Sequence, residues 1–90
     1  MTTAQDTHPG DFLIPAILSP GAAQEHKARL LTLFEADPAR RIEFTEAEGC
    51  NYASAVSLQL CLALVARQRA EGFRPDFGQE AQRLLAAQNL

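Results

Sequence analysis

Residues 48–72, EGCNYASAVSLQLCLALVARQRAEG, contain the longest apolar helical pattern in the chain and decide its fold. Apolar side chains recur at steps of three and four positions, and additional leucines widen the stripe over most of the first turns. The pattern predicts a helix over residues 54–71, capped by Asn51 or Ser54 and ended at Gly72. A helix that is apolar on several sides is typical of a buried element, so we expect it to pack against a sheet.

Two strand patterns and a helical pattern precede this segment. Residues 12–16, FLIPA, form a short β-branched and aromatic run, and Pro15 marks an edge strand or the end of the strand because it has no N–H to donate to a sheet. Residues 41–45, RIEFT, alternate polar and apolar, which predicts a half-buried strand with Glu43 on the face away from the core. Helical spacing over residues 20–35 places a helix between the strands, which favours parallel pairing with a right-handed connection.

The remaining segments complete a small α/β domain. Residues 73–77, FRPDF, contain Pro75 and predict an edge strand or an extended link, and Gly78 begins a last helix. We therefore expect a mixed or parallel sheet of about three to four strands covered by about three helices. The domain spans residues 11–90, and residues 1–10 form a disordered tail without the features of a signal or transit peptide.

Length and charge restrict the classes of function. A chain of 90 residues forms one domain with a modest core, which favours a role for a partner surface. The net charge is −3 and the 8 basic residues are scattered, so no basic stripe predicts nucleic-acid binding. No apolar run approaches the roughly 18 residues that a membrane span requires. We expect a cytoplasmic protein.

The spacing of cysteines and histidines predicts neither a metal site nor a disulfide. Cys50 lies in the loop and Cys61 in the apolar stripe of the long helix, which favours reduced thiols and a core position for Cys61. His8 and His26 are poorly placed to complete a metal site with them, and His26 fits a partly buried structural role. We expect no metal and no cofactor.

Polar side chains gather in the loop before the long helix. Glu46 and Glu48 lie beyond the carboxyl end of a strand, where they could act as acid and base or bind a divalent ion, or be solvated surface charges. Ser54 and Ser57 are candidate nucleophiles or phosphorylation sites at a helix N-terminus, although capping explains Ser54 without chemistry. Tyr52 is either an exposed anchor for a partner or a lid on the core. Without a nearby histidine or a glycine-rich phosphate loop, an enzyme is not predicted.

From residue 12 to residue 90 the chain resembles a STAS domain, the module of sulfate transporters and anti-sigma factor antagonists. The segments FLIPAILSPGAAQEHKARLLTLF and RIEFTEAEG are similar to the family's opening strand and first helix and to its central strand. ASAVSLQLCLALVARQRAEG is similar to its long helix, and EAQRLLAAQNL to its last helix. The family's first hairpin is reduced here to one strand. The resemblance implies a STAS-like fold for the whole domain.

The resemblance also implies where a regulatory switch would lie. The family usually has an aspartate, one or two serine or threonine residues, a small residue and a leucine at this point, which matches residues 54–58, SAVSL. Ser54 stands at the aspartate position, and Ala55 and Val56 stand at the positions that carry the phosphorylatable hydroxyl. These switch positions are degenerate, and only a one-residue slip of the alignment would bring Ser54 or Ser57 into use as a phosphorylation site.

Family members bind partners through this loop and the start of the long helix, which implies a regulatory interaction protein. The residues expected to bind a partner are Glu48, Cys50, Asn51, Tyr52, Ser54 and Ser57. The partner would be an anti-sigma or histidine-kinase-like regulator of a bacterial signalling system or, alternatively, the ATPase of a lipid-type ABC transporter with this chain as its cytoplasmic subunit. A different class of function is a small-ligand-binding domain that uses Glu46, Glu48 and Ser54. The sequence leaves open whether the chain forms a homodimer through the edge of its first strand.

Overall fold

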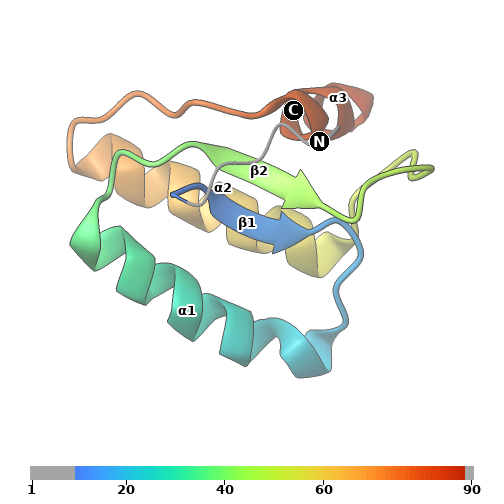
Figure 1. Ribbon diagram of the computed structural model, residues 1–90, viewed down its shortest axis with the longest axis horizontal. Helices are drawn as coiled ribbons and strands as arrows, with labels where there is room; N and C mark the ends of the chain where they lie inside the picture. Colours follow the sequence, from blue (N-terminus) through green and yellow to red (C-terminus); the bar gives the residue numbers. More distant parts are fainter. Residues whose placement is uncertain (1–9, 89–90) are drawn as a thin grey trace, which may run out of the picture.

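The computed structural model describes residues 10–88, in which two β-strands pack among three α-helices (Figure 1). Its elements in chain order are β1 (Phe12–Pro15), the short 3-10 helix η1 (Pro20–Ala22), α1 (Ala23–Ala36), β2 (Ile42–Thr45), α2 (Ala55–Ala70) and α3 (Gln79–Ala87). The predicted order of strands and helices is confirmed. Apart from Gly10, the predicted N-terminal tail lies outside the described residues.

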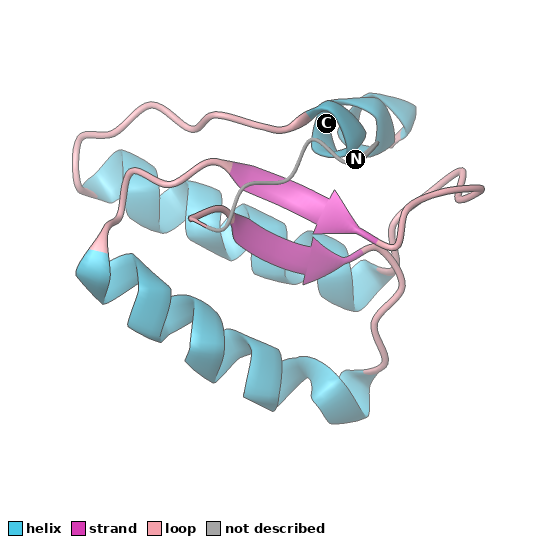
Figure 2. Cartoon of the chain, viewed as in Figure 1, coloured by secondary structure: helices cyan, strands magenta, loops and turns pink. Residues whose placement is uncertain are grey.

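The strands β1 and β2 form a parallel sheet (Figure 2). Their register pairs Phe12 with Ile42 at one end and Pro15 with Thr45 at the other. The helix α1 connects the two strands, as predicted, because a parallel neighbour requires a crossover that carries the chain back to its starting end. In Figure 1, α1 and α3 lie on opposite sides of the pair of strands and α2 lies behind it.

The predicted third strand is reduced to one bridge. Among residues 10–88 the sheet has two strands, and the segment after α2 adds an isolated bridge between Phe77 and Ile42. The Ile42 N–H donates to the Asp76 carbonyl and the Gly78 N–H donates to the Ile42 carbonyl, each at 2.8 Å. Pro75, which has no N–H, limits this pairing on one side, and Gly78 begins the cap of α3 on the other.

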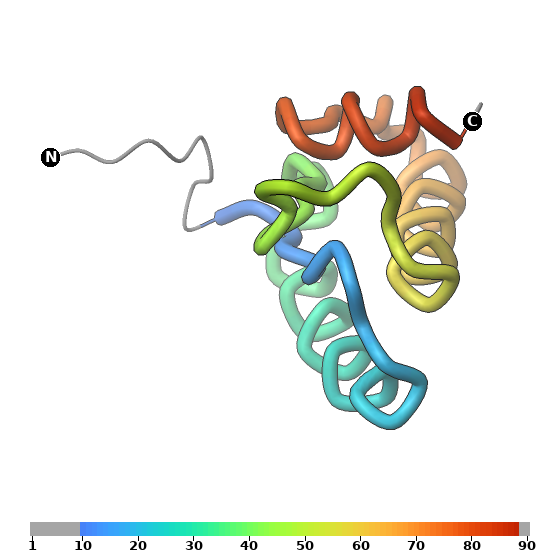
Figure 3. Tube along the Cα trace, turned by 90° about the vertical axis from the view of Figure 1, so that its right-hand side faces the viewer, coloured from blue at the N-terminus to red at the C-terminus, as the bar shows by residue number. Residues whose placement is uncertain are grey.

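One hydrophobic core joins the sheet to the three helices, which Figure 3 shows arranged around the strands. Its fully buried apolar side chains from the sheet are Phe12, Ile14, Ile42 and Phe44. The helix α2 adds its buried apolar stripe, including Cys61, as predicted. From α1, the ring of Phe34 stacks on that of Phe12 with the centroids 6.2 Å apart. The packing therefore positions both long helices directly against the strands.

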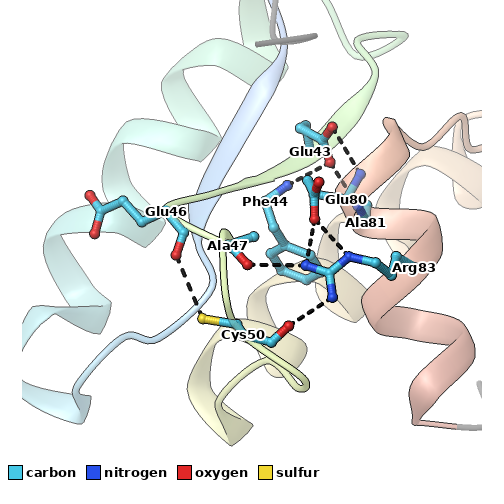
Figure 4. A network of polar contacts seen from close by, with 8 residues as sticks. All are labelled: Glu43, Phe44, Glu46, Ala47, Cys50, Glu80, Ala81 and Arg83. Carbon is cyan, nitrogen blue, oxygen red and sulfur yellow. Dashed lines mark hydrogen bonds and ion pairs between the residues drawn. The ribbon is translucent and has the colours of Figure 1, made fainter. Parts of the chain in front are cut away.

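The prediction that β2 is half-buried is wrong, because only 1 % of the surface of Glu43 is exposed. Its carboxylate caps the N-terminus of α3, where helix N–H groups lack partners within the helix. Oε1 accepts the N–H groups of Phe44 at 2.9 Å and Ala81 at 2.7 Å, and Oε2 accepts that of Glu80 at 3.2 Å (Figure 4). A Cβ at position 78 would overlap this carboxylate, so Gly78 leaves the room that the cap needs.

Candidate functional site

Two loops meet at the carboxyl ends of the strands, and Ser54 holds them together. We call residues 46–53, between β2 and α2, the docking loop, and residues 16–19 the β1 loop. The Ser54 N–H donates to the Ala16 carbonyl at 2.8 Å, and the Ser54 Oγ accepts the N–H of Leu18 at 3.0 Å. Residues 16–19 therefore cannot move far without breaking bonds to the start of α2.

Ser54 is also the N-cap of α2, as the sequence predicts. Its backbone is extended, with ψ of 159°, and its Oγ accepts the N–H of Ser57 at 3.3 Å. The same Oγ lies 3.2 Å from the carbonyl oxygen of Leu18 and 3.0 Å from the Oγ of Ser57. Asn51, the alternative cap, does not occupy the cap position. The Ser54 hydroxyl is thus engaged in holding the two loops and the helix together.

Ser57 lies inside the protein and not on the predicted partner surface. Its side chain is fully buried, and its Oγ–H donates to the Pro15 carbonyl at 2.6 Å, which ties the end of β1 to the first turn of α2. A buried hydroxyl with a short hydrogen bond is typical of a structural group. In the folded chain, neither a kinase nor a partner can reach Ser57 without opening this contact.

The helix α3 holds the docking loop from its other side through Arg83 (Figure 4). The guanidinium donates from Nη1 to the Cys50 carbonyl at 2.7 Å and from Nη2 to the Ala47 carbonyl at 3.0 Å. Its Nε also donates to the Glu80 carboxylate at 2.9 Å, which orients the guanidinium plane. The Cys50 N–H donates to the Ala47 carbonyl at 2.9 Å and closes a turn within the loop. Arg83 therefore binds the Cys50 carbonyl and adds a second hydrogen bond to the Ala47 carbonyl, which already accepts within the turn.

The tips of the two loops present large apolar side chains to solvent. Ile17, in the β1 loop, is 53 % exposed, and Tyr52, in the docking loop, is 58 % exposed. Tyr52 is therefore exposed and is not a lid on the core, whereas its role as an anchor for a partner stays a prediction. Ala55, the first residue of α2, is exposed as well, and Val56 beside it is half-buried. Exposed apolar side chains thus stand on both loops at the carboxyl end of the sheet, on a backbone that hydrogen bonds hold.

Glu46 and Glu48 are exposed in the docking loop. Glu46 has a left-handed backbone, with φ of 55°, and Gly49 has φ of 79°, which together turn the chain sharply. Figure 4 shows the Glu46 carboxylate pointing away from Arg83. Within residues 10–88 no three acidic, cysteine or histidine side chains are grouped as metal ligands. The two glutamates therefore add exposed negative charge to the docking loop, and we call this pair the acidic rim.

The two cysteines differ in environment. Cys50 is half-buried in the docking loop, and Cys61 is fully buried in the core. Burial raises the pKa of the Cys61 thiol to about 11, because an apolar surrounding disfavours the thiolate. His26 is half-buried on α1, and His8 lies outside the described residues. Cys61 therefore remains a neutral core side chain at physiological pH.

Sequence reasoning alone missed Ile17, Glu43 and Arg83. Ile17 had a signal, because it is an apolar residue placed after the proline that ends the strand, where no core position is expected. Glu43 and Arg83 had none, because their partners lie 38 and 36 residues away in the chain. Contacts at such separation follow from the packing of α3 and not from local spacing.

No family model matches the chain, and neither a curated protein nor a solved structure is significantly similar to it. None of the helices in the described part of the chain has the length and apolar character needed to cross a membrane.

Proposed function

We propose that the chain is a regulatory protein-interaction domain of the STAS type that works like an anti-sigma factor antagonist and binds a kinase-like regulator. The observation that supports this proposal best is the exposure of Ile17 and Tyr52 on two loops that Ser54 joins at the carboxyl end of the sheet. The order of a strand, a helix, a strand, a long helix and a last helix is also the order that the STAS resemblance implies.

The character of this surface favours a protein partner. Large apolar side chains that are exposed on loops with a fixed backbone lose little freedom on binding, and such residues often contribute most of the affinity of an interface. The acidic rim of Glu46 and Glu48 favours a partner with basic residues at the edge of its binding site. We therefore expect the partner to offer an apolar depression for Ile17 and Tyr52 with arginine or lysine beside it.

Binding at this surface is independent of phosphorylation in our proposal. Ala55 and Val56 carry no hydroxyl at the positions where the family has its acceptor. Ser57 is buried, and the Ser54 hydroxyl is occupied by Leu18 and by the first turn of α2. A phosphate on either serine would have to displace the bonds that hold the two loops together.

The alternatives differ in what they require of the same residues. A small-ligand-binding site built from Glu46, Glu48 and Ser54 needs a free Ser54 hydroxyl, and the hydrogen bonds of that hydroxyl disfavour it. If the chain is instead the cytoplasmic subunit of a lipid-type ABC transporter, its apolar surface would bind the transporter ATPase and not a kinase-like regulator. The identity of the partner separates these two interaction proteins.

The test is affinity capture from native cells followed by binding measurements with the purified partner. We expect a histidine-kinase-like ATPase to bind the native chain and Ile17→Glu to weaken that binding by at least about tenfold, because a charge would be buried in an apolar contact. Ala28→Glu, at an exposed position on α1, is the matched control and leaves the affinity unchanged.

Three results would contradict the proposal. A transporter ATPase as the captured partner would assign the chain to the second kind of interaction protein. If the native chain and Ile17→Glu bound the partner with equal affinity, the binding surface would have to lie elsewhere on the chain. An intact mass about 80 Da above that of the unmodified chain, located at Ser54, would show that the phosphorylation switch is present after all.

A further inference from the structure

The helix α2 has a second apolar side that the fold leaves open. Its buried side carries Ser57, Cys61, Leu64, Val65 and Gln68. We call the opposite, exposed side the outer face of α2. It carries Ala55, Gln59, Leu62, Ala63, Ala66 and Ala70, and the exposed Arg67 and Arg69 flank it near the C-terminal end of the helix. In Figure 3, α2 forms one flank of the molecule, and no described helix or strand covers the side turned away from the strands.

The composition of this face differs from that of an ordinary surface helix. A helix at the surface of a globular protein usually has charged and polar residues on its outward side. Here Leu62 is 47 % exposed at the centre of the helix, and Gln59 is the one polar residue of the face between the exposed Ala55 and Ala66, with Arg67 and Arg69 flanking the face in the last turn. A helix that is apolar on both sides is typical of one that is covered on both sides.

We propose that a second copy of the chain covers this face, with the two α2 helices packed antiparallel around a twofold axis between Leu62 and Ala63. A twofold axis brings the same patch of each copy together, so the patch must fit itself. In this arrangement Leu62 of each copy faces Ala63 of the other, and Gln59 faces Ala66. A large side chain thus meets a small one at the centre, as close helix packing requires.

The charges near the two ends of α2 specify the antiparallel direction. Glu46 and Glu48 precede the N-terminal end, and both are exposed. The residues at the C-terminal end carry a net positive charge and are Arg67, Arg69, Glu71 and Arg74. Antiparallel packing brings the acidic end of one copy to the basic end of the other at both ends of the interface, whereas parallel packing brings like charges together. The opposed helix dipoles favour the same direction.

Exposed aromatic residues extend the proposed dimer interface beyond the two α2 helices. Tyr52 lies three residues before Ala55, and Phe73 lies three residues after Ala70. Both are among the exposed large apolar residues of the described chain. Antiparallel packing brings the end that carries Tyr52 of one copy next to the end that carries Phe73 of the other. Tyr52 before the helix, Leu62 at its centre and Phe73 after it are thus spaced symmetrically about the proposed twofold axis.

The first experiment measures the mass of the full chain by sedimentation equilibrium over a range of concentrations. We expect a reversible dimer, and we expect Ala63→Glu to raise its dissociation constant by at least about tenfold, because two carboxylates would meet at the twofold axis. Ala86→Glu, at an exposed position on α3, adds the same charge away from the face and leaves the dimer intact. Circular dichroism of each variant verifies that the fold is kept.

A second experiment tests the direction of packing by exchanging charges. Glu46→Arg with Glu48→Arg makes both ends of α2 basic, and Arg69→Glu with Arg74→Glu makes both ends acidic, so each double variant should dissociate when alone. Mixed together, the two should form a heterodimer, because each basic end then meets an acidic one.

The proposal fails if the native chain remains a monomer at about 100 μM, a concentration at which even a weak specific dimer would be populated. It also fails if a dimer forms but resists Ala63→Glu and is lost in Leu13→Glu, which would place the interface at the edge of β1. Double variants that each dimerise alone as well as the native chain does would refute the antiparallel direction, because in parallel packing like charges already meet at both ends of the native interface.

Discussion

At the scale of the residue, a few buried polar groups decide how this chain packs. Glu43 and Ser57 are both buried, and each is satisfied by backbone groups of another element. A buried polar side chain that lost its partners would destabilise the fold by roughly 1–3 kcal/mol. Their energetic role is therefore structural, and the surface chemistry of the chain is left to other residues.

Gly78 offers a direct test of the Glu43 cap. Gly78→Ala should lower the free energy of unfolding by about 1–3 kcal/mol, because the new methyl group would overlap the Glu43 carboxylate and force it away from the N-terminus of α3. The backbone of Gly78 has φ of −71°, so alanine causes no backbone strain there. Urea denaturation measures the change.

Gly21→Ala is the matched control for this variant. The nearest atom to an added Cβ at position 21 is the Ser19 Oγ at 4.0 Å, an ordinary contact. We expect a change within about 0.5 kcal/mol. Equal effects of the two substitutions would show that the Glu43 cap is not what makes Gly78 necessary.

The buried thiol of Cys61 makes the free energy of unfolding depend on pH in the alkaline range. Burial raises the pKa of its thiol from 9.0 to about 11 in the folded chain. Below pH 9.0 the thiol is protonated in both states, whereas between 9.0 and about 11 the unfolded chain releases the proton first, so the free energy of unfolding falls as the pH rises through this window.

The contribution of Cys61 is isolated by comparing the native chain with Cys61→Ala. We expect the native chain to lose more stability than the variant between pH 9.0 and pH 11, measured by urea denaturation at each pH. Parallel pH profiles for the two proteins would be inconsistent with a raised thiol pKa.

At the scale of the element, α3 controls the conformation of the docking loop. It is capped by Glu43 of β2 and holds the carbonyl groups of Ala47 and Cys50 through Arg83. Two residues of the docking loop, Glu46 and Gly49, have positive φ, a conformation that neither a helix nor a strand contains. The loop therefore lacks the backbone hydrogen bonds of regular secondary structure. The clamp by Arg83 compensates for this lack of regular structure.

Arg83→Ala should loosen the docking loop without unfolding the domain. We expect faster amide hydrogen exchange within residues 46–53, with unchanged exchange in β1 and in the centre of α2, because the loop loses two hydrogen bonds from a charged donor. Hydrogen exchange with mass spectrometry measures both regions at once.

Arg29→Ala is the control, since Arg29 makes only an exposed contact with Glu25 at 3.7 Å one helical turn away. Such surface pairs contribute little to stability, so the docking loop should exchange as in the native chain. Equal exchange of the loop in Arg83→Ala and in the native chain would assign its order to the Ser54 bonds alone.

At the scale of the whole molecule, the two proposed surfaces share Tyr52. The partner surface uses Tyr52 with Ile17, and the proposed dimer places Tyr52 at one end of the α2 interface. Dimerisation and partner binding would then compete, and the partner would shift the chain from dimer to monomer by mass action. Ile17 belongs to the partner surface alone and Ala63 to the dimer face alone, so each variant tests one proposal directly, and failure of one proposal does not decide the other.

Much of the fold follows from local patterns in the sequence. The helix-sized apolar run predicts α2, Ser54 predicts its cap, and Pro15 predicts the end of β1, because each depends on neighbours within a few residues. The core position of Cys61 follows from the same patterns, whereas they left open whether Tyr52 is exposed or covers the core. The polarity of Glu43 and Ser57 predicts exposed side chains, but both are buried because each one finds a hydrogen-bond partner in a distant segment.

The sequence by itself determined the order of the elements, the parallel pairing and the location of the loop before α2, since periodicity, proline and capping residues act over short distances. Only the tertiary structure decided which polar residues are buried and which apolar residues remain outside. Glu43 is inside because the N-terminus of α3 lies over it, and Leu62 is outside because no element of the described chain packs there. Burial depends on which segments meet in space, and that is set by the packing of the whole chain.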